Sequence, residues 1–181
     1  MLKNGELELN DHNNFTNCYV KGPEESSGIC ILVQNMGSGH NIFENNTFVY
    51  GGTDLNVGNY GIAKNNTLVG GCGLSTGENS VISDNIMEGE LSVGANALVY
   101  NNTAGKLKVS GKDAYISDNV INGTVTIATK ATNTTFVKNN VSDTVTVNSK
   151  NNHIVENNVT VSGDYAIDLK KNTGNTVTDN Y

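Results

Sequence analysis

Four carboxylates in the middle of the chain could act as acid–base pairs. Asp84 and Asp118 occupy the same place in a repeated five-residue pattern, and Glu88 and Glu90 follow Asp84 closely. Two carboxyl groups that flank a glycosidic bond can hydrolyse it, one acting as the acid and the other as base or nucleophile. The alternative is structural, because Asp, like Asn, is a good hydrogen-bond acceptor at turns. The structural interpretation is favoured, and the four residues form the alternative, catalytic one.

The tyrosines are the best candidates for ligand binding. Tyr50, Tyr60, Tyr100 and Tyr115 lie in the central part of the chain, among many Asn and Asp residues. Flat aromatic rings beside amides and carboxylates suit sugar recognition. Tyr is also a common strand residue, so a packing role is the alternative. The expected ligand at these four residues is a glycan.

The histidines and cysteines show no spacing typical of a metal site. The chain has three of each: His12, His40, His153, Cys18, Cys30 and Cys72. No CxxC pair and no closely spaced histidines occur among them, whereas zinc sites normally use such spacings. No Gly-rich segment is followed by the Lys and Ser or Thr of a phosphate-binding loop. We therefore expect neither a metal nor a cofactor.

The composition excludes several classes of protein. The chain of 181 residues has 31 Asn and 20 Gly, one Pro, no Trp and no Arg, and its net charge is −7. Asn and Gly are poor helix formers, which argues against a helical bundle. An acidic chain without Arg is a poor partner for nucleic acid. No apolar stretch is long enough to insert into a membrane, and the first ten residues lack the apolar run of a signal peptide.

A repeat must position the residues described above. Its unit is two apolar residues, one variable residue, Asn or Asp, and finally Asn, as in Ile42–Asn46. Nine copies follow one another at steps of 17 to 28 residues and fill most of the chain. Short alternating segments rich in β-branched residues, such as Val125–Ile127 and Val145–Val147, lie between the copies and predict strands. Strands at such steps, stacked in parallel, predict a β-solenoid in which each coil depends on its neighbours.

The predicted fold is therefore all-β, a parallel β-helix of about nine coils in a single domain spanning residues 1–181. The longest step contains the only Pro of the chain, Pro23, and an acidic pair. Residues 21–28 are accordingly predicted to form an inserted loop that protrudes from the coils.

The final Asn of the unit is predicted to take a left-handed turn conformation, which Asn tolerates well. Coils stacked about 4.8 Å apart would bring the side-chain amides of these residues into hydrogen-bonding distance, which gives an Asn ladder. The predicted members of the ladder are Asn46, Asn66, Asn85, Asn102, Asn119, Asn140, Asn158 and Asn180.

This unit resembles the right-handed parallel β-helix repeat of the pectate-lyase-like superfamily over about residues 14–181. That superfamily includes polysaccharide lyases and hydrolases, phage tailspikes, and Asn-rich adhesin-like surface proteins of methanogenic archaea. The resemblance implies an extracellular, virion or cell-surface location, other virion or surface proteins as partners, and a homotrimer as in phage proteins. Lyases of the pectate-lyase type use an Arg as base, and this chain has none.

These observations favour a non-enzymatic β-helix module, structural or glycan-recognising, of a virion fibre, a tailspike or a cell-surface adhesin. A glycan-degrading enzyme of the hydrolase type, which would use Asp84, Asp118, Glu88 or Glu90, is the alternative. A third hypothesis is an ice-binding face made by four threonines: Thr124, Thr126, Thr144 and Thr146.

Overall fold

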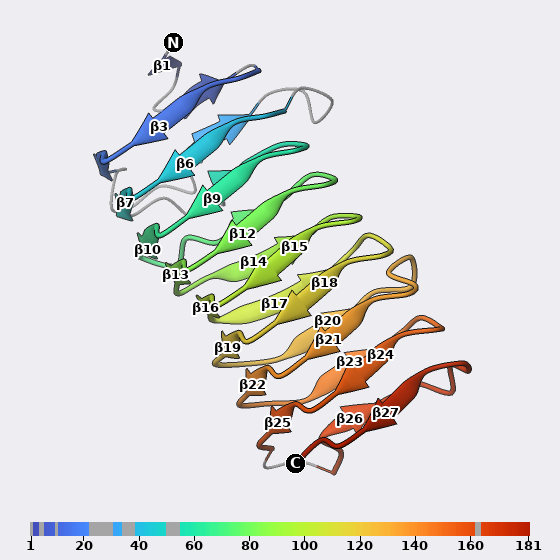
Figure 1. The fold of residues 1–181 in the computed structure, drawn as a ribbon. Helices are drawn as coiled ribbons and strands as arrows, with labels where there is room; N and C mark the ends of the chain where they lie inside the picture. Colours follow the sequence, from blue (N-terminus) through green and yellow to red (C-terminus); the bar gives the residue numbers. More distant parts are fainter. Residues whose placement is uncertain are drawn as a thin grey trace.

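The chain folds into a parallel β-solenoid whose coils follow one another along a single axis (Figure 1). The computed structural model describes residues 2–3, 6–9, 11–21, 31–33, 39–49, 55–161 and 164–181. Within these ranges the regular elements are all strands, so the all-β prediction is confirmed. Figure 1 shows the N-terminal and C-terminal coils at opposite ends of the stack.

Three long parallel sheets run along the solenoid. The nine-stranded sheet consists of β3 (Asn14–Thr16), β6 (Ile42–Glu44), β9 (Ile62–Lys64), β12 (Val81–Ser83), β15 (Leu98–Tyr100), β18 (Tyr115–Ser117), β21 (Thr135–Val137), β24 (His153–Val155) and β27 (Thr176–Thr178). The eight-stranded sheet consists of β4 (Tyr19–Lys21), β7 (Thr47–Val49), β10 (Thr67–Val69), β13 (Ile86–Met87), β16 (Thr103–Ala104), β19 (Val120–Ile121), β22 (Asn140–Val141) and β25 (Asn158–Val159). The seven-stranded sheet consists of β8 (Leu55–Asn56), β11 (Leu74–Ser75), β14 (Glu90–Val93), β17 (Lys106–Val109), β20 (Val125–Ile127), β23 (Val145–Val147) and β26 (Ile167–Asp168).

A small sheet joins β1 (Leu2–Lys3), β2 (Glu6–Leu9) and β5 (Ile31–Val33), in which β1 and β2 are antiparallel. The three long sheets together make about seven complete turns, against the nine expected from the repeat. Tyr50 and residues 22–28 of the predicted loop lie outside the described residues, and Lys21 ends β4. No helix in the described part of the chain is long and apolar enough to span a bilayer.

The core is a narrow column filled from all three long sheets. In each strand of the nine-stranded sheet the middle residue points inward, so that Phe43, Ile82, Ile116 and Phe136 are fully buried. The residues on either side of them point outward, as the period of two in a strand requires. A single coil cannot enclose these side chains, so the coils above and below complete their burial.

The Asn ladder runs along one corner of the solenoid, between the nine-stranded and eight-stranded sheets. The side-chain amide of Asn46 donates to Oδ1 of Asn66 at 3.0 Å, and the backbone N–H of Asn46 donates to the same oxygen at 3.0 Å. The pattern repeats from coil to coil, and each of the eight amides also donates to a backbone carbonyl. The members are Asn46, Asn66, Asn85, Asn102, Asn119, Asn139, Asn157 and Asn180.

Two predicted members of the ladder were wrong, because the column passes through Asn139 and Asn157 and not through Asn140 and Asn158. The register aligns Phe136 with the inward Ile116, so the repeat unit begins one residue earlier than the apolar pattern indicated. In each of these two coils an outward valine, Val137 or Val155, follows the inward residue. The apolar pattern alone does not distinguish this valine from an inward residue. Asn140 and Asn158 are instead exposed, and Nδ2 of Asn158 donates to Oδ1 of Asn140 at 3.2 Å.

The left-handed residue of this corner is the one before the ladder Asn. The prediction that the ladder Asn itself is left-handed was therefore wrong. Asn45, Asp84 and Asp118 have φ angles of 56°, 58° and 57°. Lys138 and Glu156 take the same place with φ angles of 57° and 55°. The left-handed residue keeps its own side chain in solvent, and the residue that follows it turns its amide into the coil.

A second corner, on the other side of the nine-stranded sheet, was not predicted from the sequence. Here the backbone N–H and the side chain of Asn13 both donate to Oδ1 of Asn41, and Asn152 donates in the same way to Asn175. A left-handed residue precedes this position in every coil. These residues are His12, His40, Tyr60, Asn79, Asn96, Asp113, Asn133, Asn151 and Gly174. The corner therefore carries a column of side chains in register, most of which are exposed.

Candidate functional site

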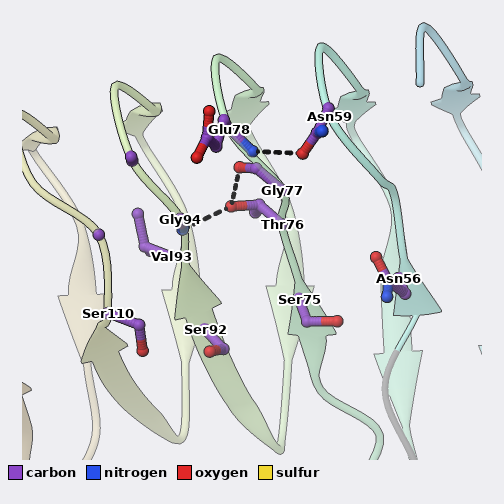
Figure 2. A pocket seen from close by; sticks show the side chains of 12 residues that line it. Asn56, Asn59, Ser75, Thr76, Gly77, Glu78, Ser92, Val93, Gly94 and Ser110 are labelled. Atoms are coloured by element: carbon purple, nitrogen blue, oxygen red, sulfur yellow. Dashed lines mark hydrogen bonds between the residues drawn. The ribbon is translucent and has the colours of Figure 1, made fainter. Parts of the chain in front are cut away.

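A groove crosses the coils where the seven-stranded sheet turns toward the nine-stranded sheet (Figure 2). Its volume is about 510 Å³, which lies in the range typical of small-ligand sites. It is lined by Asn56, Asn59, Ser75, Thr76, Gly77, Glu78, Ser92, Val93, Gly94, Ala95, Ser110 and Gly111. The lining comes from four successive coils, so the long direction of the groove follows the solenoid axis.

Strand register lines up the polar side chains of the groove. Asn56 pairs with Ser75, and Ser75 pairs with Ser92, so the three side chains form one outward row on β8, β11 and β14. Figure 2 shows this row along the strands, with the turn residues beyond the strand ends. Neighbouring residues of a row lie about 4.8 Å apart along the axis. The row therefore offers small polar groups at a regular spacing.

Glycines allow successive coils to approach closely at the turn that borders the groove. A Cβ atom added to Gly77 would lie 2.2 Å from Oδ1 of Asn59, and one added to Gly94 would lie 2.3 Å from the carbonyl oxygen of Gly77. Real Cβ atoms do not approach other heavy atoms so closely, so successive coils can pack at these distances only without side chains. This tightly packed turn lies beside the polar row and lines the groove with it.

Hydrogen bonds hold the rim of the groove in place. Oδ1 of Asn59 accepts from the backbone N–H of Glu78 at 2.8 Å, and Oγ1 of Thr76 accepts from the backbone N–H of Gly94 at 2.9 Å. Both bonds join one coil to the next (Figure 2). The hydroxyl of Thr76 donates in turn to the carbonyl of Gly77 at 3.1 Å. The rim is fixed before any ligand arrives.

Several polar groups of the groove are available to a ligand. Among the described residues, none forms a hydrogen bond with the hydroxyl of Ser75, Ser92 or Ser110. A serine hydroxyl both donates and accepts. Glu78 is the one ionisable residue among those that line the groove. The groove thus presents groups that can donate and accept hydrogen bonds, and its lining residues include no pair of carboxylates for acid–base chemistry.

The four carboxylates of the alternative catalytic set lie elsewhere. Asp84 and Asp118 occupy the left-handed turn column, and Oδ1 of Asp84 accepts from Nδ2 of Asn101 at 3.4 Å in the next coil. They thus take the place of asparagine at a turn, as the structural interpretation of the sequence has it. Neither aspartate lines the groove.

Glu88 and Glu90 do come together, on the border of a second cavity of about 390 Å³. Oε2 of Glu88 accepts from the backbone N–H groups of Gly70 at 2.9 Å and Gly71 at 3.2 Å. Glu90 is the strand partner of Lys106, which lines the same cavity. This second cavity contains the two carboxylates that the groove lacks.

The three described tyrosines of the predicted glycan site do not line the groove. Tyr100 and Tyr115 lie on the outer face of the nine-stranded sheet, in β15 and β18, and Tyr115 is 47% exposed. Tyr60 lies on the second corner, is 52% exposed, and stacks on His40. The structure therefore separates Tyr60 from the other two.

A stack of three rings on the second corner was missed in the sequence. The ring centroids of His12 and His40 are 4.6 Å apart, those of His40 and Tyr60 are 4.9 Å apart, and the ring planes are nearly parallel. A signal was present, since each of the three residues stands two positions before a strand of the nine-stranded sheet. Linear spacing hides this relation, because the repeat steps between them are 28 and 20 residues.

Asp11 lies beside the two histidines. Its Oδ1 accepts from the backbone N–H of Gly39 at 2.7 Å, and its Oδ2 lies 3.1 Å from Nδ1 of His12. Nδ1 of His40 is 3.7 Å from Oδ1 of Asp11. The hydrogen bond from Gly39, followed by the neighbouring imidazoles, holds the pKa of the Asp11 carboxyl below its usual range. The carboxylate is therefore anionic at neutral pH.

Comparisons of the chain with models of protein families, with curated proteins and with solved structures give no match, so its parallel β-solenoid fold rests on its own strand pairing and Asn ladder.

Proposed function

We propose that the chain is a non-enzymatic β-solenoid module that binds a glycan in the groove over β8, β11, β14 and β17. One observation carries the proposal: a preformed groove presents the hydroxyls of Ser75 and Ser92 in register on adjacent coils, and its lining includes only one ionisable side chain. Sugar hydroxyls need partners that donate and accept, and serine hydroxyls do both. The rigid rim lowers the entropy that ordering the site would cost.

The proposal extends to the setting of the module. A stack of coils fixed by an internal amide ladder is a stiff rod, which suits a spacer in a virion fibre, a tailspike or a cell-surface adhesin. A groove along the side of such a rod would meet glycans of a cell surface. A homotrimer and contacts with other virion or surface proteins belong to the same proposal, as does the relationship to the pectate-lyase-like superfamily.

Filling the groove tests the proposal. Ser92→Trp places a large ring among the lining residues, and we expect it to abolish binding to the glycan that the unmodified protein selects from an array of surface oligosaccharides. Thr126→Trp is the matched control, because Thr126 lies on the same outward row two coils further on and does not line the groove. Equal binding by both variants, or no glycan bound by the unmodified protein, would reject the proposal.

The cavity of Glu88 and Glu90 supports a second candidate function, a glycan hydrolase. Glu88 is held by two backbone N–H groups, Glu90 is the strand partner of Lys106, and both glutamates line one cavity, which supplies the two carboxyl groups that a glycosidase uses. Release of reducing ends from surface polysaccharides, lost in Glu90→Gln, would favour this function. Release that persists in Glu90→Gln would exclude it.

A further inference from the structure

The stacked column at the second corner brings together three residues whose side chains are metal ligands. Asp11, His12 and His40 each offer one ligand atom, and these atoms lie within 4.8 Å of one another. Two imidazoles and one carboxylate form a common ligand set for zinc and related divalent ions, with further positions left for water or a ligand. All three residues are exposed, so an ion can reach them from solvent.

The fold itself sets the spacing between the two coils. The backbone N–H of His12 donates to Gly39, and that of His40 donates to Asn59, so the two histidines stand on adjacent rungs. A Cβ atom on Gly39 would lie 1.8 Å from the carbonyl oxygen of Asn59, so glycine is required for this close approach. The two imidazoles are thus brought together by backbone contacts between successive coils.

The carboxylate is held in place by the same coils. Its Oδ1 is fixed by the N–H of Gly39, which leaves Oδ2 directed toward the imidazole of His12. Asn59 accepts in the same way from Glu78 one coil further on, so an amide can replace the carboxylate at this position. What Asp11 adds to the corner is negative charge beside two imidazoles.

We propose that Asp11, His12 and His40 form a binding site for a divalent transition metal of the zinc class, which clasps two successive coils together. Nitrogen ligands select this class over calcium and magnesium, which prefer sites made of oxygen atoms. A metal held by two coils binds the folded chain better than the unfolded one, so it stabilises the solenoid at this end.

One side chain must move when the ion binds. Neighbouring ligand atoms around tetrahedral zinc lie about 3.3 Å apart, given bonds of about 2.0 to 2.1 Å. The lone pair of an imidazole nitrogen lies in the ring plane, so two parallel rings cannot both direct it at one ion between them. Tyr60 covers the other face of His40, whereas the side chain of His12 is 70% exposed. His12 is accordingly the ring that turns out of the stack toward the ion.

Titration calorimetry with zinc chloride on the full chain tests the site. We expect one ion per chain, and a fall in affinity of about tenfold or more in His12→Asn and in His40→Asn. Asn is the natural residue of this column at Asn79, Asn96, Asn133 and Asn151, all left-handed, so the variants should fold. Circular dichroism checks this point. Asp11→Asn keeps an acceptor for Gly39, and its effect isolates the contribution of the charge.

His153→Asn is the matched control, because His153 is an exposed histidine on β24 that lies far along the chain from the other two. It should leave the zinc affinity unchanged, and magnesium chloride should give no comparable signal. Equal zinc affinity in the unmodified protein and in the double variant His12→Asn/His40→Asn would overturn the proposal, as would an equal loss in His153→Asn. Glycan binding in the groove is measured separately, so failure of one proposal leaves the other standing.

Discussion

Single asparagine side chains stabilise this fold by hydrogen bonds that cross from coil to coil. Asn102 shows how many bonds one amide can make. Its Oδ1 accepts from the backbone and the side chain of Asn85, at 3.0 and 2.9 Å, while its Nδ2 donates to Asn119 and to the carbonyls of Ile82 and Tyr100. Asn85, Asn102, Asn119 and Ile82 are buried, and only the bond to Tyr100 is partly exposed, so removal of the amide leaves several buried polar groups without partners.

Asn102→Ala should therefore lower the free energy of unfolding by about 3 kcal/mol, since it leaves several buried polar groups without partners. Asn140→Ala is the matched control. The side chain of Asn140 is exposed and lies outside the buried column, so its loss should change stability by less than about 0.5 kcal/mol. Denaturant unfolding of both variants measures the difference. A loss in Asn140→Ala as large as the one expected for Asn102→Ala would mean that the ladder passes through Asn140 and not through Asn139.

Acid should weaken the C-terminal coil through a single carboxylate. The side chain of Lys170, and then its backbone N–H, lower the pKa of Asp168 from its ordinary 3.8. A group whose pKa is depressed by folding stabilises the fold at pH values above its unfolded pKa. That stabilisation is lost as the pH falls through the lower, folded value.

Asp168→Asn should flatten the dependence of stability on pH below about pH 4, where unfolded aspartate becomes protonated. Asp118→Asn is the comparison, because the Asp118 carboxylate takes part in none of the hydrogen bonds of the described residues. Thermal unfolding measured at a series of pH values from pH 5 downward gives the dependence of stability on pH for each variant. A steeper acid loss in Asp168→Asn than in the unmodified protein would contradict the sign of this argument.

The turns after the strands of the seven-stranded sheet determine how closely successive coils approach one another. The corner after β8, β11 and β14 can be tight because glycine stands at successive rungs, and these glycines line the groove. Gly77→Ala would place Cβ at 2.6 Å from the backbone nitrogen of Asn59, which the structure can relieve only by separating the coils.

Gly77→Ala should lower stability by about 1 to 3 kcal/mol, as overpacking does elsewhere, and it should weaken glycan binding as well. Ser75→Ala, in the same groove, removes an outward hydroxyl without crowding, so it should lower glycan affinity with little change in the melting temperature. Calorimetry and an oligosaccharide binding assay separate the two effects. Gly77→Ala with unchanged stability would show that the coils are not in contact at this corner.

The sequence predicted the elements whose residue types recur at the same positions of every repeat, and it missed the elements that lack such recurrence. The corner of the Asn ladder was found because apolar, turn and ladder residues recur together, and six of the eight predicted members are correct. The groove was missed because β8 and β11 are two residues long and β14 is four. Strands this short show no clear alternation of apolar and polar residues in the sequence. The pair His12 and His40 was missed because three-dimensional closeness in a solenoid follows the repeat and not the spacing along the chain.

The whole molecule is a one-dimensional stack, in which each coil is stabilised mainly by the two beside it. The inward residues of successive strands form a continuous column, and Ile116 in β18 packs between the strand partners Val99 and Phe136. No described coil has an apolar core of its own, so the stability of the stack is close to a sum of terms between neighbours.

Ile116→Ala should lower the free energy of unfolding by about 2 to 4 kcal/mol, because a buried side chain is lost and a cavity remains. The same model predicts where the damage spreads. Amide hydrogen exchange should speed up most in β15, β18 and β21, which share the cavity, and much less in β6, which lies four strands away in the same sheet. If protection instead fell equally in every strand, the solenoid would unfold as one unit, and the description by neighbouring coils would have to be abandoned for a globally cooperative core.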